Sequence, residues 1–254
     1  MESVWLTGAS QGIGRALAIE LAKEKRHIYA SARNELALQE LKQEIESLGY
    51  PGLLIPKPLD ICKADDVHRV CEDIQHEGRL DKIILNAGTY HPAPATEFNC
   101  QALRELFELN VFGTAHCLEA CLKTLRLQGG GQIVLVASLA AYRGLPDSAA
   151  YGASKSALIH LAESLYTELH AHNIEIKIVN PGFVETPLTD KNEFTMPQRV
   201  TAEWAAKTIV KGLDKSGFEI RFPWVFSQFM SLLRALPYGL YFRLIRRFVV
   251  SSNA

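Results

Sequence analysis

Short apolar stretches alternate with longer stretches of helical periodicity along this 254-residue chain, and this alternation constrains the fold more than any other feature. The short stretches are mostly continuous apolar runs, which is typical of parallel strands that helices cover on both faces. The predicted strands span residues 4–7, 27–31, 53–55, 82–85, 132–137, 174–179 and 218–222. The predicted helices span residues 12–25, 34–48, 64–77, 99–127, 150–172 and 201–215. This order predicts an α/β fold built on a doubly wound, mostly parallel, seven-stranded sheet.

A glycine-rich loop lies between the first predicted strand and the first predicted helix. Glycines at positions 8, 12 and 14 allow a tight turn and a close approach of the backbone to a bound group. The helix that follows directs unpaired N–H groups and the positive end of its dipole towards the loop, where they favour a phosphate. A simple tight turn is the alternative, but the place of the loop in the fold favours a dinucleotide site. The loop residues predicted to contact the dinucleotide are Gly8, Ser10, Gln11, Gly12, Ile13 and Gly14.

The end of the second predicted strand bears on the choice of dinucleotide. An acidic side chain at this point would hydrogen-bond the ribose hydroxyls of NAD and repel the 2′-phosphate of NADP. Residues 29–34 contain no acid, and they include Arg33, whose guanidinium can form a charge-assisted fork with that phosphate. The alternative is a solvated arginine at the start of a helix. We therefore expect NADP rather than NAD as the cofactor.

Tyr151 and Lys155 are four residues apart at the start of a predicted helix, so they lie on one face and one turn apart. A free tyrosine has a pKa near ~10, and a neighbouring ammonium favours its phenolate. Such a phenol is a candidate general acid or base. An exposed helix pair is the alternative, because this spacing is common by chance. The context favours catalysis, since Ser138 follows the core of the fifth predicted strand and the glycine loop lies upstream.

Together these residues resemble the short-chain dehydrogenase/reductase family. Residues 7–14 match its T-G-x-x-x-G-x-G loop, and further matches are N-A-G at 86–88, Y-x-x-x-K at 151–155 and P-G-x-V-x-T at 181–186. The resemblance spans residues 3–222. The chain departs from many NADP-dependent members at Gln11, where those members carry a basic residue. The resemblance implies a Rossmann-type fold, a nicotinamide cofactor, and a homodimer or homotetramer in which helix 150–172 carries a subunit face.

The resemblance also implies a role for each matching residue. Tyr151 is the expected general acid or base, Lys155 binds the nicotinamide ribose, and Ser138 holds the substrate oxygen. Asn110, inside a mostly apolar predicted helix, is expected to hold a water that links Lys155 to solvent; a buried structural amide is the alternative. The remaining matches are expected to contact the adenosine or the nicotinamide: Asp60, Ile61, Asn86, Ala87, Gly88, Pro181, Gly182, Val184 and Thr186.

These roles predict an NADP-dependent oxidoreductase that transfers a hydride between the nicotinamide and a carbonyl or hydroxyl carbon. The apolar C-terminal tail and the loop 183–196 indicate a small hydrophobic carbonyl compound or alcohol as substrate. A regulator that senses NADP without turning it over is the alternative. Such a regulator would have no need of Ser138, Tyr151 and Lys155 together.

The C-terminal tail differs from the rest of the chain in charge. From Ile220 onward there are five arginines and no acidic residue. We expect residues 1–222 to form one Rossmann-type domain and residues 223–254 to be a helical extension of it. Within the tail, residues 238–250 have the pattern of an amphipathic basic helix. Three roles for the tail stay open: contact with an anionic membrane surface, a lid over the substrate cleft, or a subunit interface.

The remaining features exclude several classes of protein. A net charge of -1 gives no general attraction for nucleic acid, and no His or Cys cluster has the spacing of metal ligands. The five cysteines include no C-x-x-C pair, and Cys117 and Cys121 are expected to pack in the core. No apolar run reaches the ~18 residues of a spanning helix, and a strand begins almost at the N-terminus. We therefore expect a cytoplasmic protein, with peripheral membrane contact through the tail as one of the open alternatives.

Overall fold

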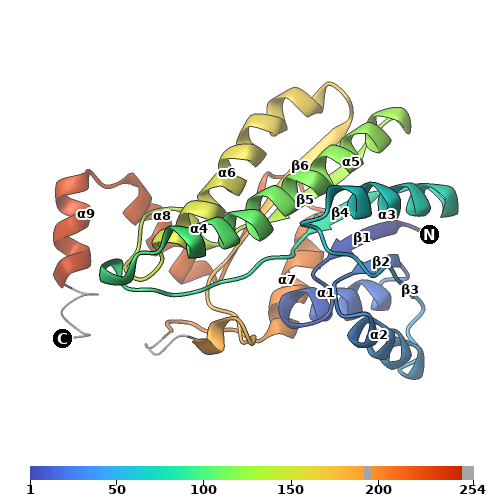
Figure 1. The fold of residues 1–254 in the computed structure, drawn as a ribbon, viewed down its shortest axis with the longest axis horizontal. Helices are drawn as coiled ribbons and strands as arrows, with labels where there is room; N and C mark the ends of the chain where they lie inside the picture. Colours follow the sequence, from blue (N-terminus) through green and yellow to red (C-terminus); the bar gives the residue numbers. More distant parts are fainter. Residues whose placement is uncertain (192–195, 248–254) are drawn as a thin grey trace.

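The computed structural model describes residues 1–191 and 196–247, and its centre is a seven-stranded sheet (Figure 1). The strand order is β3-β2-β1-β4-β5-β6-β7, and each of the six pairings between neighbours is parallel. The strands are β1 (Ser3–Thr7), β2 (His27–Ser31), β3 (Leu53–Pro56), β4 (Lys82–Leu85), β5 (Gly131–Val136), β6 (Ile174–Pro181) and β7 (Glu219–Phe222). The predicted doubly wound α/β fold is confirmed, with a sheet that is parallel throughout rather than mostly parallel.

Helices cover both faces of the sheet (Figure 1). One layer holds α1 (Gly12–Lys23), α2 (Glu35–Ser47) and α7 (Ala202–Leu213), and the other holds α3 (Ala64–Glu77), α4 (Cys100–Phe107), α5 (Gly113–Leu127) and α6 (Ala149–His170). Strand β1 shows why the strand sequences are continuously apolar. Its Val4 and Leu6 pack into the core beneath the first layer, whereas Trp5 between them packs into the core beneath the second.

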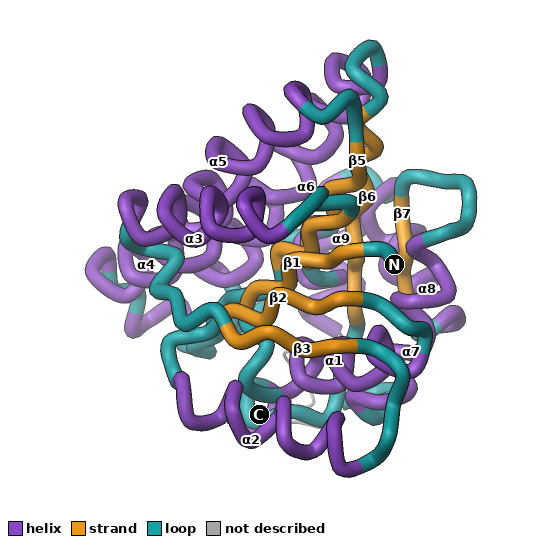
Figure 2. The backbone as a smooth tube through the Cα atoms, turned by 90° about the vertical axis from the view of Figure 1, so that its right-hand side faces the viewer, coloured by secondary structure: helices purple, strands orange, loops and turns teal. Residues whose placement is uncertain are grey.

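Three helices begin one residue later than predicted, because their first expected residue is a cap; before α4, Asn99 accepts hydrogen bonds from the backbone N–H groups of Gln101 and Ala102. Asn34 accepts a hydrogen bond from the backbone N–H of Ala37 at 3.1 Å, and Thr201 accepts one from that of Trp204 at 3.1 Å. A capping side chain satisfies an N–H group that has no partner within the helix. Figure 2 shows the N-terminal strands β1, β2 and β3 side by side, with α2 along one side of them.

The long helix predicted over residues 99–127 is interrupted. A π-helical segment, Glu108–Phe112, separates α4 from α5 and contains Asn110, which is fully buried. Such segments widen a helix locally and are frequent at functional sites. Gly113 follows the segment and lies against Ile61, where an added Cβ would come within 2.7 Å of that side chain. The apolar pattern runs through the segment without a break, so periodicity alone did not reveal it.

The tail forms two helices, α8 (Trp224–Ala235) and α9 (Tyr238–Ile245), at the end of the molecule opposite the N-terminus (Figure 1). Met230, Leu233 and Tyr241 are buried and belong to the same apolar cluster as the core beneath α3, α5 and α6. Residues 248–250, the end of the second helical stretch predicted from the sequence, lie outside the described residues. Across the described part of the chain, no helix is both long and apolar enough to span a bilayer.

Candidate active site

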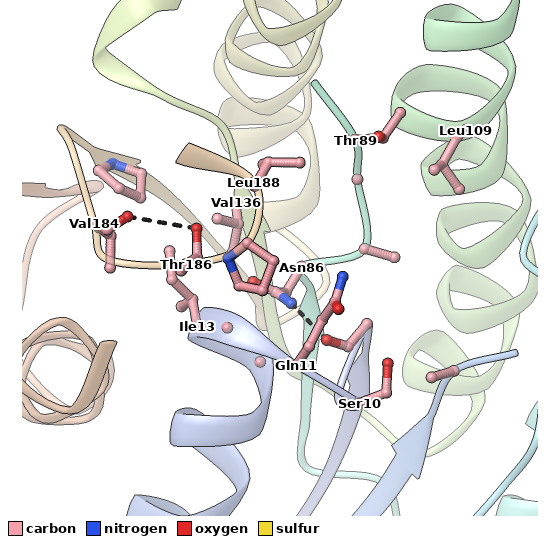
Figure 3. A pocket seen from close by; sticks show the side chains of 18 of the residues that line it. Ser10, Gln11, Ile13, Asn86, Thr89, Leu109, Val136, Val184, Thr186 and Leu188 are labelled. Carbon is pink, nitrogen blue, oxygen red and sulfur yellow. Dashed lines mark hydrogen bonds between the residues drawn. The ribbon is translucent and has the colours of Figure 1, made fainter. Parts of the chain in front are cut away.

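A pocket of about 570 Å³ opens where the parallel strands end, and this size is within the range of small-molecule and cofactor sites. Loops that follow β1, β2, β3, β4, β5 and β6 contribute to its wall (Figure 3). Every residue predicted for the site except Asn110 lines it: Gly8, Ser10, Gln11, Gly12, Ile13, Gly14, Arg33, Asp60, Ile61, Asn86, Ala87, Gly88, Ser138, Tyr151, Lys155, Pro181, Gly182, Val184 and Thr186.

The glycine loop is held tightly against the end of β4. Gly8 has a φ of +69°, and an added Cβ would lie 2.7 Å from Cα of Ala87. At Gly14 an added Cβ would lie 2.1 Å from the carbonyl oxygen of Gly8, so neither position accepts a side chain without a backbone shift. The Nδ2 group of Asn86 donates to the carbonyl oxygens of Thr7 and Gly8 at 3.2 and 3.1 Å. Asn86 therefore supports the loop as well as lining the pocket.

The start of α1 faces the loop that follows β6. Gly12 has a φ of +54°, and an added Cβ would lie 3.0 Å from Cγ2 of Thr186. Figure 3 shows Thr186 and Val184 near Ile13 at the same side of the pocket. The side chain of Gln11, the residue before α1, makes no capping hydrogen bond in the described structure. The first N–H groups of α1 are therefore left for an anion such as a pyrophosphate.

Arg33 lies at the part of the pocket that β2 and α2 form, and its side chain is exposed. Asp60 and Ile61, which follow β3, line the pocket too, so the loops after β2 and β3 share one binding site. The Asp60 carboxylate accepts a hydrogen bond from the backbone N–H of Cys62 at 3.1 Å. This contact fixes the turn that carries Ile61.

Ser138 lies just past the end of β5 and is 8% exposed. Its Oγ accepts a hydrogen bond from the backbone N–H of Ala140 at 3.1 Å, which fixes the side chain at the start of a 3₁₀ turn. Lys155 is 4% exposed, and its Nζ donates to the carbonyl oxygen of Val136 at 2.9 Å. Because α6 begins at Ala149, Lys155 lies in its second turn, close to the end of β5.

Tyr151 lies one turn before Lys155 on α6, and the two side chains line the same pocket as Ser138. The ring of Tyr90 meets that of Tyr151 edge-on, with centroids 4.8 Å apart and planes at 68°. Such edge-to-face contacts favour one ring orientation. The segment after β4 therefore helps to orient the Tyr151 phenol.

Burial controls the protonation of this pair. It raises the pKa of Tyr151 to about 12, although the Ser138 hydroxyl opposes the increase, and it lowers the pKa of Lys155 to about 8. The sequence had led us to expect that Lys155 would lower the pKa of the phenol. That expectation is wrong for this structure, because the loss of solvation disfavours the charged form of both groups. The phenol is therefore protonated at neutral pH.

Asn110 lies behind the pocket wall rather than in it. Its Nδ2 donates to the carbonyl oxygen of Thr89 and to Oγ of Ser154, both at 3.0 Å, and its Oδ1 accepts from the N–H of Thr89 at 2.8 Å. A Cβ added to Gly88 would lie 3.1 Å from both Oδ1 of Asn110 and Nζ of Lys155, so the amide and the ammonium flank this glycine. These bonds fit the structural role of the amide. The water-holding role stays a prediction.

Several residues of the pocket wall were not predicted. They are neighbours of predicted residues in the chain: Leu59, Thr89, Leu109, Val136, Leu188 and Thr189. Figure 3 shows Thr89 and Leu109 together on one side of the pocket, opposite Leu188. Leu59, Thr89 and Leu109 could have been found as chain neighbours of the predicted residues Asp60, Gly88 and Asn110. Leu188 and Thr189 could have been found as part of the loop that follows β6. Among the described residues, no group of three or more acidic, His or Cys side chains could hold a metal ion.

The buried thiols of Cys71, Cys117 and Cys121 lie away from this pocket. They pack between α3 and α5 as free cysteines. The expected packing role of Cys117 and Cys121 agrees with this position.

Comparisons with known proteins agree with the fold. A family model described as short chain dehydrogenase matches residues 2–196. An uncharacterized oxidoreductase of Myxococcus xanthus is 34% identical over 243 residues, which cover 95% of each chain. A short chain dehydrogenase from Burkholderia cenocepacia, solved with NADP, has a TM-score of 0.82 at 25% identity and covers 96% of this chain and 99% of its own.

A second solved structure, a short chain dehydrogenase/reductase from Burkholderia phymatum, contains NAD and has a TM-score of 0.81. The match covers 91% of this chain and 92% of that chain, and its 22% identity supports the fold alone. The extent of the family match and the near full-length relative lead to one conclusion: this chain belongs to the short-chain dehydrogenase/reductase family of oxidoreductases.

Proposed function

We propose that the protein is an NADP-dependent oxidoreductase that acts on a carbonyl or hydroxyl carbon. The observation that carries this proposal is a single pocket lined both by the glycine loop and by Ser138, Tyr151 and Lys155. The loop fits a dinucleotide, because Gly8 and Gly14 let it pack tightly against the end of β4 and the first N–H groups of α1 stay available for the pyrophosphate. Bound in this pocket, the nicotinamide supplies or accepts the hydride.

The protein's own residues bind the substrate oxygen and transfer the proton. In the reductive direction, the hydroxyls of Ser138 and Tyr151 donate hydrogen bonds to the carbonyl oxygen, and Tyr151 then transfers its proton to that oxygen. A pKa of about 12 keeps the phenol protonated and ready to donate at neutral pH. Lys155 binds the ribose hydroxyls of the nicotinamide nucleoside through its ammonium group. In the oxidative direction, the phenolate accepts the proton of the alcohol.

NADP is proposed as the cofactor on the strength of Arg33. This exposed guanidinium lines the pocket directly after β2, where no acidic side chain is present to bind the ribose hydroxyls of NAD. The neighbouring Asn34 caps α2, so the N-terminus of that helix adds a positive dipole end near the same place. Both features favour a 2′-phosphate.

A hydrophobic carbonyl compound or alcohol is the proposed substrate. The pocket wall includes Leu109, Val136 and Leu188. The rings of Phe183 and Phe226 lie 5.5 Å apart, and Phe226 comes from the inner side of α8 next to Gly182. Apolar walls favour a substrate that loses little solvation when it enters.

A panel of hydrophobic ketones, aldehydes and alcohols, followed at the nicotinamide absorbance, tests the proposed function. We expect turnover of at least one ketone or aldehyde with NADPH. A protein that binds NADPH in calorimetry yet turns over no member of the panel would instead be the non-catalytic NADP sensor. The relatives give no support to that alternative, and a sensor has no use for all three of Ser138, Tyr151 and Lys155.

We also propose that copies of the chain associate through α6 as a homodimer or homotetramer. Its partly exposed apolar side chains recur every four residues, at Ala153, Ala157, Leu161 and Leu165. This spacing forms a stripe along one side of the helix. Light scattering of the purified chain tests the proposal, and a monomer at micromolar concentration would contradict it.

A further inference from the structure

The two tail helices carry a concentration of exposed apolar side chains. Among the described residues, sixteen large hydrophobic side chains are exposed, and seven of these lie between residues 224 and 242. Six of the seven are at least half exposed, and we refer to these six as the tail patch: Trp224, Val225, Phe229, Leu232, Tyr238 and Phe242. Isolated exposed apolar residues are normal on a protein, whereas a contiguous group indicates a binding surface.

Helix α8 is apolar on two sides. Its inner side buries Met230 and Leu233 in the core, and they are 2% and 3% exposed. Its outer side presents Trp224, Phe229 and Leu232, at spacings of five and three residues, and they are 54–72% exposed. Only the inner side of α8 packs against the core. Ser227, Gln228, Ser231 and Arg234 make the rest of the helix polar, so the exposed apolar side chains of the outer side are not required by packing against the core and are available to a partner.

Helix α9 follows the corner at Pro237 and carries the other two residues of the tail patch. The rings of Tyr238 and Phe242 stack on each other with centroids 5.8 Å apart, and both are exposed. Arg143 contacts both sides of this corner. Its guanidinium carbon lies 4.4 Å from the centroid of the Tyr238 ring, and its Nη2 donates to the carbonyl oxygen of Leu236 at 3.1 Å. The patch is therefore a supported surface rather than a loose end of the chain.

The charge around the tail patch indicates which kind of partner the patch binds. All 28 acidic residues of the chain precede Ile220, whereas five arginines follow it. Three of these five, Arg243, Arg246 and Arg247, lie on or next to α9 and are exposed. Aromatic and aliphatic side chains combined with arginines match the interface of a bilayer that contains anionic lipids.

A second copy of the chain fits this surface less well. Arg221 and Arg234 already pair with Glu219 and Glu163. Pairing of two tail patches about a two-fold axis would still bring the arginines of both α9 helices together, and residues 220–254 contain no acidic side chain. We therefore propose that the tail patch docks the protein onto the surface of an anionic lipid bilayer. This docking is independent of the reaction that the pocket carries out.

Docking on this side would leave the active site free. Phe226 faces inwards from α8 and contacts Phe183, whereas the tail patch is on the outer side of the same helix. Bilayer and pocket would thus lie on opposite sides of α8. A hydrophobic substrate dissolved in the bilayer would be close to the pocket.

Flotation of the full chain with vesicles tests the proposal. We expect the protein to float with vesicles of phosphatidylcholine and phosphatidylserine, to bind less to vesicles of phosphatidylcholine alone, and to dissociate as salt is raised. The salt dependence follows from screening of the arginines. Failure to bind the vesicles that contain phosphatidylserine would overturn the proposal.

Two pairs of matched variants locate the surface. Trp224→Ser with Phe229→Ser is expected to weaken the partition onto anionic vesicles by at least about tenfold. The reason is that the variant lacks two aromatic side chains that the bilayer interface would bury. The control removes two apolar side chains elsewhere that are more exposed than Trp224 and Phe229, in Leu36→Ser with Leu127→Ser, and should bind like the wild type. Likewise, Arg243→Gln should weaken binding, whereas Arg126→Gln on α5 should not.

Tryptophan fluorescence gives an independent readout. Trp5 is fully buried, Trp204 is 46% exposed and Trp224 is 72% exposed, so a blue shift on addition of vesicles should come from Trp224. We expect Trp224→Phe to abolish the shift and Trp204→Phe to keep it. If light scattering shows instead that the Trp224→Ser, Phe229→Ser variant dissociates a dimer while the wild type ignores vesicles, the surface is a subunit interface and the proposal is wrong.

Discussion

Lys155 and Tyr151 illustrate how burial sets the charge of a candidate catalytic group. Nζ of Lys155 has one backbone carbonyl within reach, that of Val136, and no carboxylate contributes to its pKa. Burial therefore lowers the pKa of the amine to about 8 and raises that of the phenol to about 12. Both groups are closer to neutral than free side chains are, which gives the site a dependence on pH that can be measured.

The first prediction concerns stability as a function of pH. The pKa of Lys155 falls from an ordinary 10.5 to about 8 on folding, so between these values the unfolded chain binds the extra proton. Stability should therefore rise with pH in this window, and at about 1.4 kcal/mol per pKa unit the rise amounts to roughly 3 kcal/mol. Chemical unfolding of the wild type and of Lys155→Met, compared from pH 7 to pH 11, should show this difference. Lys123→Met on the exposed side of α5 is the control, and a Lys155→Met difference that stays flat with pH would show that Lys155 is well solvated.

The second prediction concerns Arg33. Removal of a guanidinium that forms a charge-assisted fork with a phosphate costs about 1.5–3 kcal/mol. Arg33→Ala should therefore lower kcat/KM for NADPH by about tenfold to a hundredfold and leave the value for NADH nearly unchanged. Arg69→Ala, an exposed arginine on α3 outside the pocket, serves as the control. An equal loss with both dinucleotides would show that Arg33 does not contact the 2′-phosphate.

At the scale of elements, the loop 139–149 connects the candidate catalytic residues to the tail. It lies between Ser138 and α6, and its Arg143 contacts the rings of Tyr238 and Tyr241 with the guanidinium carbon 4.4 and 4.7 Å from their centroids. The same side chain donates to the carbonyl oxygen of Arg234 at 2.9 Å. One arginine thus joins the segment between Ser138 and Tyr151 to the corner between α8 and α9.

The third prediction follows from this junction. Arg143→Ala should destabilise the packing of α9 by about 1–2 kcal/mol, through the loss of two cation–π contacts and of hydrogen bonds to the corner. Hydrogen exchange should show faster exchange in α9 and unchanged exchange in α1. Arg143→Lys keeps the charge but not the planar fork and should give an intermediate result. Unchanged protection of α9 in Arg143→Ala would mean that the tail is held by Tyr241 and the core alone.

The elements themselves could largely be predicted from the sequence, with the bounds of the strands off by one or two residues. Buried parallel strands are apolar at every position, so each run of Val, Ile and Leu stands out from its neighbours. The π-helical segment at Glu108–Phe112 could not be predicted, because one extra residue in a turn leaves an apolar pattern intact. Its consequence, the burial of Asn110 against Thr89, depends on a contact between segments that are distant in the sequence.

For the molecule as a whole, the sequence could predict that the candidate site residues line one pocket, but not the pKa values within that pocket. Motifs at the ends of β1, β4 and β5 must meet, because parallel strands end on one edge of the sheet. The sign of the pKa change at Tyr151 depends instead on how deeply the loops after β4 and β5 bury the phenol. We propose that the tail completes a single domain with residues 1–222, since Met230 and Tyr241 share its core.

The fourth prediction separates binding from chemistry and tests the role of Tyr151 most directly. In Tyr151→Phe the ring and its contact with Tyr90 remain, and only the hydroxyl that exchanges the proton is lost. Calorimetry should give a Kd for NADPH within a few-fold of the wild type, whereas kcat with the best carbonyl substrate should fall by roughly a hundredfold to ten-thousandfold, the usual worth of a general acid. Retention of full turnover in Tyr151→Phe with NADPH still bound would show that the proton comes from another group and would contradict the proposed catalytic role of this pocket.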